Sequence, residues 1–351
     1  MSGQIDGPAV VRTTRGLGTL KILLSSHFFA PSIGGLETAS ALLADAFVAQ
    51  GNEVRVVTMS AASASDREHS FRVIRRPSIV GLLQELRWCE IYVHNHISLR
   101  SAWPLAVVRR PWVIIHQTYI DGSGKGLVKR WISRRADIQV ALSNRMAQEF
   151  DGAVVIHNPY DDKLFRMLPG VPRTRELIFV GRLVSEKGVS LLLRGVRMLV
   201  DRKVSLTLTV VGDGPERGKL EGIARELGVA DKVVFAGIKR GTELVELLNK
   251  HKVMVVPSQG QETFGIVALE GLACGCTVVV ADRGGLPEAV GSAGLVFEGD
   301  APESLADCVE RALTSLELIK GLRKDAPGHL GRHYPKVIAE QYLKLFRGLV
   351  K

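Results

Sequence analysis

The chain has 351 residues and a mass of 38.2 kDa, a length that suits two ordinary domains. Hydrophobic residues make up 46% and charged residues 23%, which excludes a disordered, collagen-like or disulfide-stapled protein. Lys and Arg number 46 against 36 Asp and Glu, and the net charge of +10 indicates anionic partners such as nucleic acid, a phospholipid surface or phosphate-bearing small molecules.

From Leu20 onward, short apolar segments alternate with amphipathic ones. The strands predicted in the first half are Lys21–Ser25, Glu53–Thr58, Phe71–Arg75, Ile91–His94, Trp112–His116, Ile138–Leu142 and Val154–His157. Those predicted in the second half are Glu176–Val180, Leu206–Val211, Lys232–Ala236, Val253–Val256, Thr277–Ala281 and Leu295–Phe297. Several are continuous Val/Ile/Leu runs, which indicate parallel strands buried on both faces. Amphipathic helices such as Glu37–Gln50, Glu216–Leu227 and Glu303–Leu316 lie between them, so the pattern predicts a doubly wound α/β architecture.

Changes in composition divide the chain into four parts. Residues 1–19 contain no apolar core and are expected to form a disordered leader rather than a signal peptide. Two prolines and a glycine at Leu168–Pro172 mark a seam between domains at 20–168 and 169–334. Residues 335–351 are predicted to form a helix that need not pack on the second domain. No run of 18 apolar residues is present, so we expect no membrane-spanning segment.

The number and spacing of the cysteines indicate the cellular compartment of the protein. The four cysteines fit neither a zinc site nor a redox pair, and they are too sparse for a disulfide framework. We therefore expect a cytoplasmic protein.

Basic residues are concentrated between Ser60 and Arg135. This segment holds 13 Lys/Arg against five Asp/Glu, which accounts for +8 of the total charge. It contains no nucleic-acid-binding motif, so we expect no nucleic-acid partner. The alternatives are a solvated basic face and a surface for an anionic membrane or acceptor, which would place the protein at the inner face of the membrane.

Candidate binding residues follow the predicted strands. Gly34 and Gly35 open the first helix, where free backbone amides can receive an anion. Arg182 and Lys187 follow the first strand of the second domain and could hold phosphate oxygens. Surface charge alone would also explain that pair of cations. Neither a dinucleotide fingerprint nor a P-loop is present.

The strongest motif is QETFGIVALEGLACG, in which Glu262 lies at a helix entrance and Glu270 eight residues later. The two carboxylates are too far apart to share one proton, so separate contacts to a long ligand are expected. The apolar, glycine-rich surroundings predict a buried helix, in which an idle carboxylate would be costly.

Together with GRLVSEKG at 181–188, VVGDGPE at 210–216 and RGGLPE at 283–288, these motifs resemble the retaining nucleotide-sugar glycosyltransferases of glycosyltransferase family four, the group-one type. The resemblance covers nearly the whole chain from Leu20, with the motifs in the same order. It implies the GT-B fold, in which two Rossmann-like domains face each other across a cleft. The first domain would take the acceptor, the second would bind the donor, and the final helix would return to the first domain.

The resemblance also implies roles for single residues. Arg182 and Lys187 would hold the diphosphate, Glu270 the ribose hydroxyls and Glu262 the donor sugar. The amides of Phe264, Gly265 and Ile266 would contact sugar and phosphate, and the loop at Gly34 and Gly35 would close over the phosphates. No metal ion and no bound cofactor would be needed, because cations and helix entrances can stabilise the departing nucleoside diphosphate.

His116 ends the strand WVIIH, where the family keeps a histidine near the reacting carbon, so His116 and Glu262 are the predicted catalytic residues. Two positions depart from the family pattern: Gln117 follows the histidine, and Asn158 precedes a proline instead of a glycine. His94 and His96 lack a third ligand at a recognisable spacing, which argues against a zinc site.

The sequence therefore predicts a retaining glycosyltransferase that moves a hexose-type sugar from a UDP- or GDP-linked donor to a hydroxyl. The acceptor could be a glycan, a lipid-linked molecule or a small molecule. The alternatives are a sugar-nucleotide epimerase or disaccharide phosphorylase of the same fold, or a non-catalytic binder of nucleotide sugars or anionic lipid.

Overall fold

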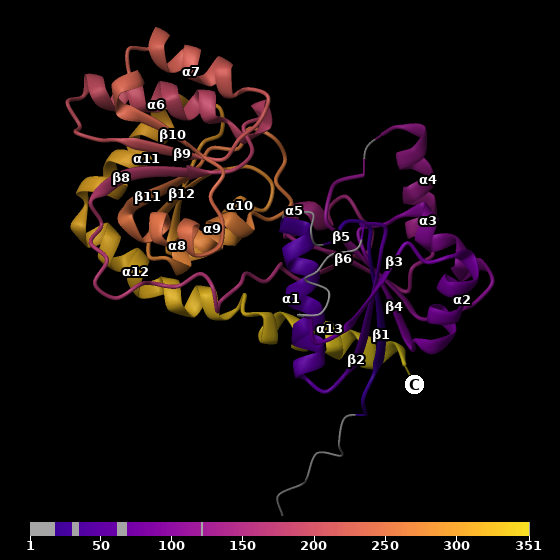
Figure 1. Cartoon of the computed structure of the whole chain (residues 1–351). Helices are drawn as coiled ribbons and strands as arrows, with labels where there is room; N and C mark the ends of the chain where they lie inside the picture. Colours follow the sequence, from indigo (N-terminus) through magenta and orange to yellow (C-terminus); the bar gives the residue numbers. More distant parts are fainter. Residues whose placement is uncertain (1–17, 30–34, 62–68, 121, 351) are drawn as a thin grey trace, which may run out of the picture.

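The computed structural model describes residues 18–29, 35–61, 69–120 and 122–350, which form two parallel sheets flanked by helices (Figure 1). The first sheet consists of β1 Lys21–Ser26, β2 Glu53–Thr58, β3 Arg72–Arg75, β4 Ile91–Asn95, β5 Trp112–His116, β6 Ile138–Ala141 and β7 Val154–Val155. Its helices are α1 Gly35–Ala49, α2 Ile79–Trp88, α3 Leu99–Ala102, the 3₁₀ helix η2 Trp103–Ala106, α4 Gly124–Ser133 and α5 Asn144–Ala147.

The second sheet consists of β8 Arg175–Val180, β9 Leu208–Val211, β10 Val233–Gly237, β11 His251–Val256, β12 Thr277–Ala281 and β13 Gly294–Phe297. Its longer helices are α6 Val189–Asp201, α7 Arg217–Glu226, α8 Gly241–Lys250, α9 Ile266–Ala273, α10 Leu286–Val290, α11 Pro302–Thr314 and α12 Leu316–Gly331. Short 3₁₀ helices are η3 Ser185–Lys187, η4 Ala230–Lys232 and η5 Gly291–Ala293. The last helix is α13 Pro335–Leu349.

The strand orders are β3-β2-β1-β4-β5-β6-β7 and β10-β9-β8-β11-β12-β13, and every described pair is parallel. The predicted architecture of two doubly wound parallel sheets is therefore confirmed. Several strand boundaries differ from the predicted ones by one or two residues, and the strand expected at Val154–His157 ends at Val155. His157 instead turns toward Glu288, which belongs to the other half of the chain.

Crossover handedness places the helices of the first sheet on opposite faces. The chain moves in one direction from β1 to β2 and in the other from β3 to β4, β5 and β6. Because such crossovers are right-handed, α1 covers one face while α2, α3 and α4 cover the other. Figure 1 shows this separation, with α1 and α13 on the side of the sheet away from α2 and α4.

The C-terminal helix packs on the first sheet's helix α1. The rings of Phe346 and Tyr342 lie 5.6 and 6.2 Å from that of Phe47, and the side-chain amide of Gln50 donates to the carbonyl of Lys336 at 3.1 Å. The chain thus crosses from the second sheet back to the first through α12 and α13 (Figure 1). Burial of three aromatic rings holds this crossing in place.

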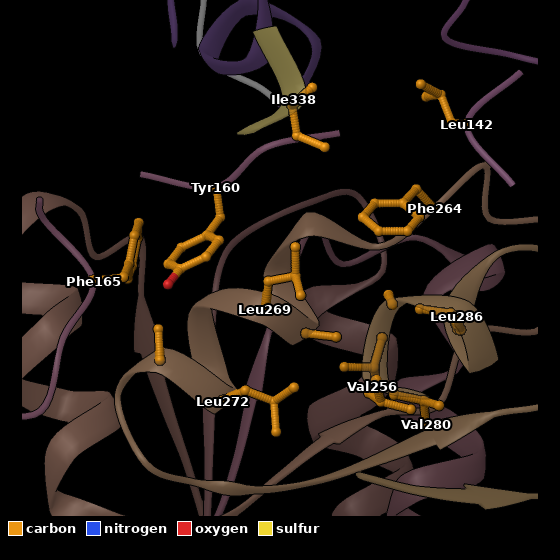
Figure 2. Packing of buried hydrophobic residues seen from close by; sticks show 14 of the residues in the cluster. Leu142, Tyr160, Phe165, Val256, Phe264, Leu269, Leu272, Val280, Leu286 and Ile338 are labelled. Carbon is orange, nitrogen blue, oxygen red and sulfur yellow. The ribbon is translucent and has the colours of Figure 1, made fainter. Parts of the chain in front are cut away.

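The carboxyl ends of the two sheets meet. Asn144, three residues beyond β6, donates its backbone N–H to Glu288 at 2.8 and 3.0 Å, and Arg145 pairs with Asp282, the residue after β12, at 3.2 Å. The buried apolar residues form one continuous cluster across the junction. Figure 2 shows Phe264 and Leu269 of the second half below Leu142 and Ile338. Among the described residues, no helix is long and apolar enough to cross a membrane.

Candidate active site

Two loops that follow β8 and β11 bring Lys187 and Glu262 together. The ammonium of Lys187 forms an ion pair with Oε1 of Glu262, which also accepts a hydrogen bond from the hydroxyl of Ser258 at 2.7 Å. Both charged side chains are partly buried, at 28% and 19% exposed. A half-desolvated cation beside the entrance of α9 is suited to receiving an anion.

Gly188 explains how these loops approach so closely. It adopts φ 71°, and a Cβ at this position would lie 1.8 Å from the carbonyl oxygen of Pro257. The carbonyl of Glu186 accepts from the amides of Gln259 and Gly260 at 2.8 and 3.0 Å. Only glycine permits this contact, so the glycine ending GRLVSEKG is required for the position of Lys187.

The RGGLPE segment supports the other side of Glu262. The amide of Gly285 donates to the carbonyl of Glu262 at 2.8 Å. At Gly284, where φ is 52°, a Cβ would lie 1.8 Å from that same carbonyl oxygen. The second glycine-rich motif therefore fixes the loop that leads into α9.

Three backbone amides are available at the entrance of α9. The N–H groups of Phe264, Gly265 and Ile266 donate to no described residue. The ring of Phe264 is buried and stacks on His157 at 4.9 Å, which holds the loop rigid. Unpaired amides at a helix N-terminus attract negatively charged oxygen atoms.

Gly35, the first residue of α1 in the first domain, lies close to the start of α9. A Cβ on Gly35 would lie 3.6 Å from the side chain of Ile266, so the beginnings of α1 and α9 face each other. Gly34 lies outside the described residues. The structure therefore brings together Gly35, Lys187, Glu262, Phe264, Gly265 and Ile266.

The side-chain carboxyl of Glu270, on α9, makes no hydrogen bond or ion pair with any described residue. Burial, followed by the nearby charge of Asp161, raises the pKa of its carboxyl to about 7. A partly buried carboxyl without a partner is free to accept hydrogen bonds from a ligand. Arg182 is the second residue after β8 and is exposed, with no ion-pair partner among the described residues.

In the described part of the chain, His116 makes no hydrogen bond, ion pair or ring contact with these residues. It ends β5 fully buried, with Nε2 3.0 Å from the side-chain oxygen of Gln139 and its ring stacked on Phe150 at 3.6 Å. Burial lowers its pKa to about 4, so the ring is neutral at physiological pH. Its Nδ1 is buried and has no partner among the described residues.

The two positions that depart from the family pattern contact each other. Gln117 and Asn158 exchange amide hydrogen bonds of 3.1 and 3.3 Å, and Gln117 also donates to Asn95 at 2.7 Å. These buried amides tie the ends of β4 and β5 to the residues after β7. Neither departure could be interpreted from sequence, because the partners are 41 residues apart.

Sequence reasoning did not assign roles to three groups near this junction. Ser258 fixes Glu262, and Glu288 joins the halves through Asn144 and His157, the latter at 3.2 Å. On the first domain, burial and then Lys129 lower the pKa of His96 to about 4, and its Nδ1 lies 3.3 Å from the hydroxyl of Thr118. One sequence signal could have indicated Glu288: it is an acidic residue in the first turn of α10, which begins directly after Gly284 and Gly285.

His94 and His96 do not form a metal site. Both nitrogens of His94 are occupied, one by the hydroxyl of Ser101 at 3.0 Å and the other by the indole N–H of Trp112 at 2.8 Å. His96 adopts φ 74°, which turns it away from the strand. The described residues contain no cluster of three or more potential metal ligands.

A cavity of about 450 Å³ lies elsewhere, beside the crossing segment. It is lined by residues including Phe165, Arg173, Leu272 and Tyr334, and by none of the predicted site residues. The site is therefore defined by loop contacts at the sheet ends rather than by this cavity.

The chain is similar to known proteins in sequence and in fold. The sequence pattern of the family described as glycosyl transferases group 1 matches residues 163–328. A D-inositol 3-phosphate glycosyltransferase of Corynebacterium jeikeium is 37% identical over 190 residues, which cover 51% of this chain and 45% of the relative. One of Acidothermus cellulolyticus is 35% identical over 293 residues, covering 76% of this chain and 64% of the relative. In the first of these, the matched region spans less than half of the relative's length.

Solved structures share the whole architecture. Anabaena Alr3699/HepE in complex with UDP and glucose superposes with a TM-score of 0.79 at 20% identity, over 94% of this chain and 100% of that one. A glycosyltransferase from Rickettsia africae superposes with a TM-score of 0.80 at 16% identity, over 95% and 100%. Through residues 163–328 the chain belongs to the group 1 glycosyltransferase family, glycosyltransferase family four, and its two sheets form the GT-B fold.

Proposed function

We propose that this protein is a retaining glycosyltransferase that moves a sugar from a nucleoside-diphosphate sugar to a hydroxyl acceptor. One observation carries the proposal: Lys187, Glu262 and three unpaired amides converge at the entrance of α9, where Gly35 of the first domain meets Ile266. This arrangement offers positive charge for a diphosphate and a carboxylate for sugar hydroxyls. The family of the chain supports the same assignment.

The proposed donor-side roles are those that the family resemblance implies, and the contacts support them. Lys187 and the exposed Arg182 hold the diphosphate and stabilise the charge that develops as it departs. Glu262, whose orientation Ser258 fixes, contacts the donor sugar. Glu270, which has no described partner, accepts hydrogen bonds from the ribose hydroxyls. Gly35 faces the phosphates from the first domain.

The catalytic assignment of His116 rests on a single unsatisfied atom. Its Nδ1 has no described partner, and a donor hydroxyl would supply one once the ring leaves Phe150. Because the ring is neutral at physiological pH, His116 accepts or orients a hydrogen bond and does not donate a proton to the leaving group.

The proposed donor is a UDP-sugar, and GDP is the alternative. One protein of similar fold, Anabaena Alr3699/HepE, has been solved with UDP and with UDP-glucose. The acceptor is proposed to be a glycan, a lipid-linked molecule or a small hydroxyl compound, with the reaction at the cytoplasmic face of a membrane.

A nucleotide panel followed by a transfer assay tests the proposal. UDP or GDP at 100 times its dissociation constant should stabilise the protein by about 2.7 kcal/mol, which thermal unfolding detects. Lys187→Met should abolish this shift and donor hydrolysis, whereas the matched control Lys324→Met, an exposed lysine far along the chain, should preserve both. No shift with either nucleotide would refute the donor site.

The products distinguish the alternatives. Retention at the anomeric carbon of a new glycoside supports transfer. An epimerised sugar nucleotide, phosphate-dependent cleavage of a disaccharide, or tight nucleotide binding without turnover would assign the protein to the other classes.

A further inference from the structure

The first domain carries an exposed apolar surface on α2, on η2 with the residue after it, and on α4. The residues that form it, called the docking surface below, are Ile79, Val80, Trp103, Val107, Leu127, Val128 and Trp131. They are between 40% and 66% exposed and make up seven of the 15 large apolar residues exposed in the described part of the chain. Such clustering marks an interaction site rather than scattered exposure.

Helix α4 exposes three of its four large apolar residues, and only Ile132 packs against the core. Leu127, Val128 and Trp131 occupy one helical face and point to solvent, while Gly126 and Ser133 face the domain. An amphipathic helix of a globular domain normally buries its apolar face. The apolar face of α4 therefore has no cover among the described residues.

The three segments lie on one side of the molecule. They belong to consecutive right-handed crossovers, which place α2, α3 with η2, and α4 on the face of the sheet opposite α1 (Figure 1). Arg110 ties the loop after η2 to α2, because its guanidinium donates to the carbonyls of Leu86 and Arg87 at 2.9 and 2.8 Å.

Positive charge surrounds this apolar surface. Between residues 79 and 135 the sequence has nine Lys/Arg and three Asp/Glu. Two of these acids are engaged elsewhere, since Glu85 pairs with Arg55 of β2 and Glu90 accepts from the backbone of Lys21. On α4 itself, Lys125 is exposed, and Arg135 lies over the ring of Trp131 at 3.5 Å.

We propose that the docking surface binds an anionic lipid bilayer, with α4 lying in the headgroup layer. Apolar side chains between exposed cations match the boundary of acyl chains and anionic headgroups, and the two tryptophans suit that interface. A second copy of the chain fits less well, because it would bring two strongly basic surfaces together.

The surface adjoins the proposed acceptor side. Burial is the main cause of the lowered pKa of both His27 and His96, which lie at the ends of β1 and β4, and the charge of Lys129, half-buried on α4, contributes to both. Docking would place these strand ends next to the bilayer. This consequence, that an acceptor arrives from the lipid phase, rests on the proposed function, whereas bilayer binding itself does not.

Co-sedimentation of the full chain with vesicles tests the inference. The protein should bind vesicles of phosphatidylcholine mixed with phosphatidylglycerol and not vesicles of phosphatidylcholine alone. The double variant Leu127→Ser/Trp131→Ser should bind more than about tenfold more weakly. The double variant Lys125→Gln/Arg134→Gln should bind about 30-fold more weakly, because each cation near an anionic surface contributes about 1 kcal/mol.

Matched controls replace exposed residues of the second half and of α13. Val234→Ser/Leu316→Ser and Lys324→Gln/Lys344→Gln should bind like the unmodified protein. Equal binding to neutral and anionic vesicles, or unchanged binding of both α4 variants, would overturn the inference. So would a concentration-dependent dimer that Trp131→Ser abolishes, because the surface would then be a contact between copies. Vesicle binding that persists without any nucleotide shift would refute the proposed function and leave this inference intact.

Discussion

Replacing Glu270 by glutamine should make the protein more stable and less able to bind nucleotide. The carboxyl has an ordinary pKa of 4.5 in the unfolded chain and about 7 in the folded protein, chiefly because of burial. Between these values the unfolded chain releases a proton that the folded protein retains, so stability falls as the pH rises from 4.5 to 7. Above pH 7 the full cost of ionising the buried carboxyl is present.

The magnitude follows from the difference in pKa. At about 1.4 kcal/mol for each pKa unit, a difference of about 2.5 corresponds to at most about 3.5 kcal/mol. Glu270 is partly exposed, so we expect Glu270→Gln to stabilise the protein by about 1–2 kcal/mol at pH 8 and by nothing at pH 4.5. Loss of a hydrogen bond to a charged group should weaken nucleotide binding by about 10- to 100-fold.

Urea unfolding at pH 8 and pH 4.5, with nucleotide titration at pH 8, measures both effects. The control Glu226→Gln, an exposed carboxyl at the end of α7, should change neither. A variant no more stable than the unmodified protein at pH 8, or equally stabilised at both pH values, would show that burial does not raise the Glu270 pKa. Unchanged nucleotide affinity would remove Glu270 from the donor site.

Three further substitutions test contacts that hold the two domains and the site in place. Glu288→Ala removes the acceptor of three hydrogen bonds from Asn144 and one from His157. The free energy of unfolding, measured in urea, should fall by about 1–2 kcal/mol. An unchanged free energy of unfolding would mean that the junction between the domains does not depend on these hydrogen bonds. Phe346→Ala should cost about 3–5 kcal/mol by emptying the contact with Phe47, and an intact melting temperature would contradict this packing. Burial lowers the pKa of His333 to about 3, so below pH 6.5 the unfolded chain binds a proton at this residue that the folded protein does not. Together with the other buried histidines, whose pKa values are also lowered, His333 makes stability fall as the pH drops, and its own share is up to about 1.4 kcal/mol per pH unit. His333→Phe should reduce the slope by that share, and an unchanged slope would refute it.

The sequence alone determined the order of strands and helices. In a chain where strands and helices alternate, continuous Val/Ile runs such as Thr277–Ala281 predict strands that are buried on both faces. The glycines of the GRLVSEKG and RGGLPE motifs were also informative, since Gly188 and Gly284 stand where any side chain would collide with a carbonyl oxygen. These are local properties, and local properties can be read from neighbouring residues.

Only the tertiary structure decided which residues touch. Lys187 pairs with Glu262 across 75 positions, and Gln117 pairs with Asn158, because parallel strands bring their carboxyl ends to one edge. The sequence placed His116 at a strand end but not its burial against Phe150. The sequence located the excess positive charge at residues 60–135, but it did not show that the apolar residues of α4 point to solvent. From the sequence alone, such residues would be predicted to face a core. Burial depends on what packs against an element, and that is set by the whole fold rather than by the element's own residues.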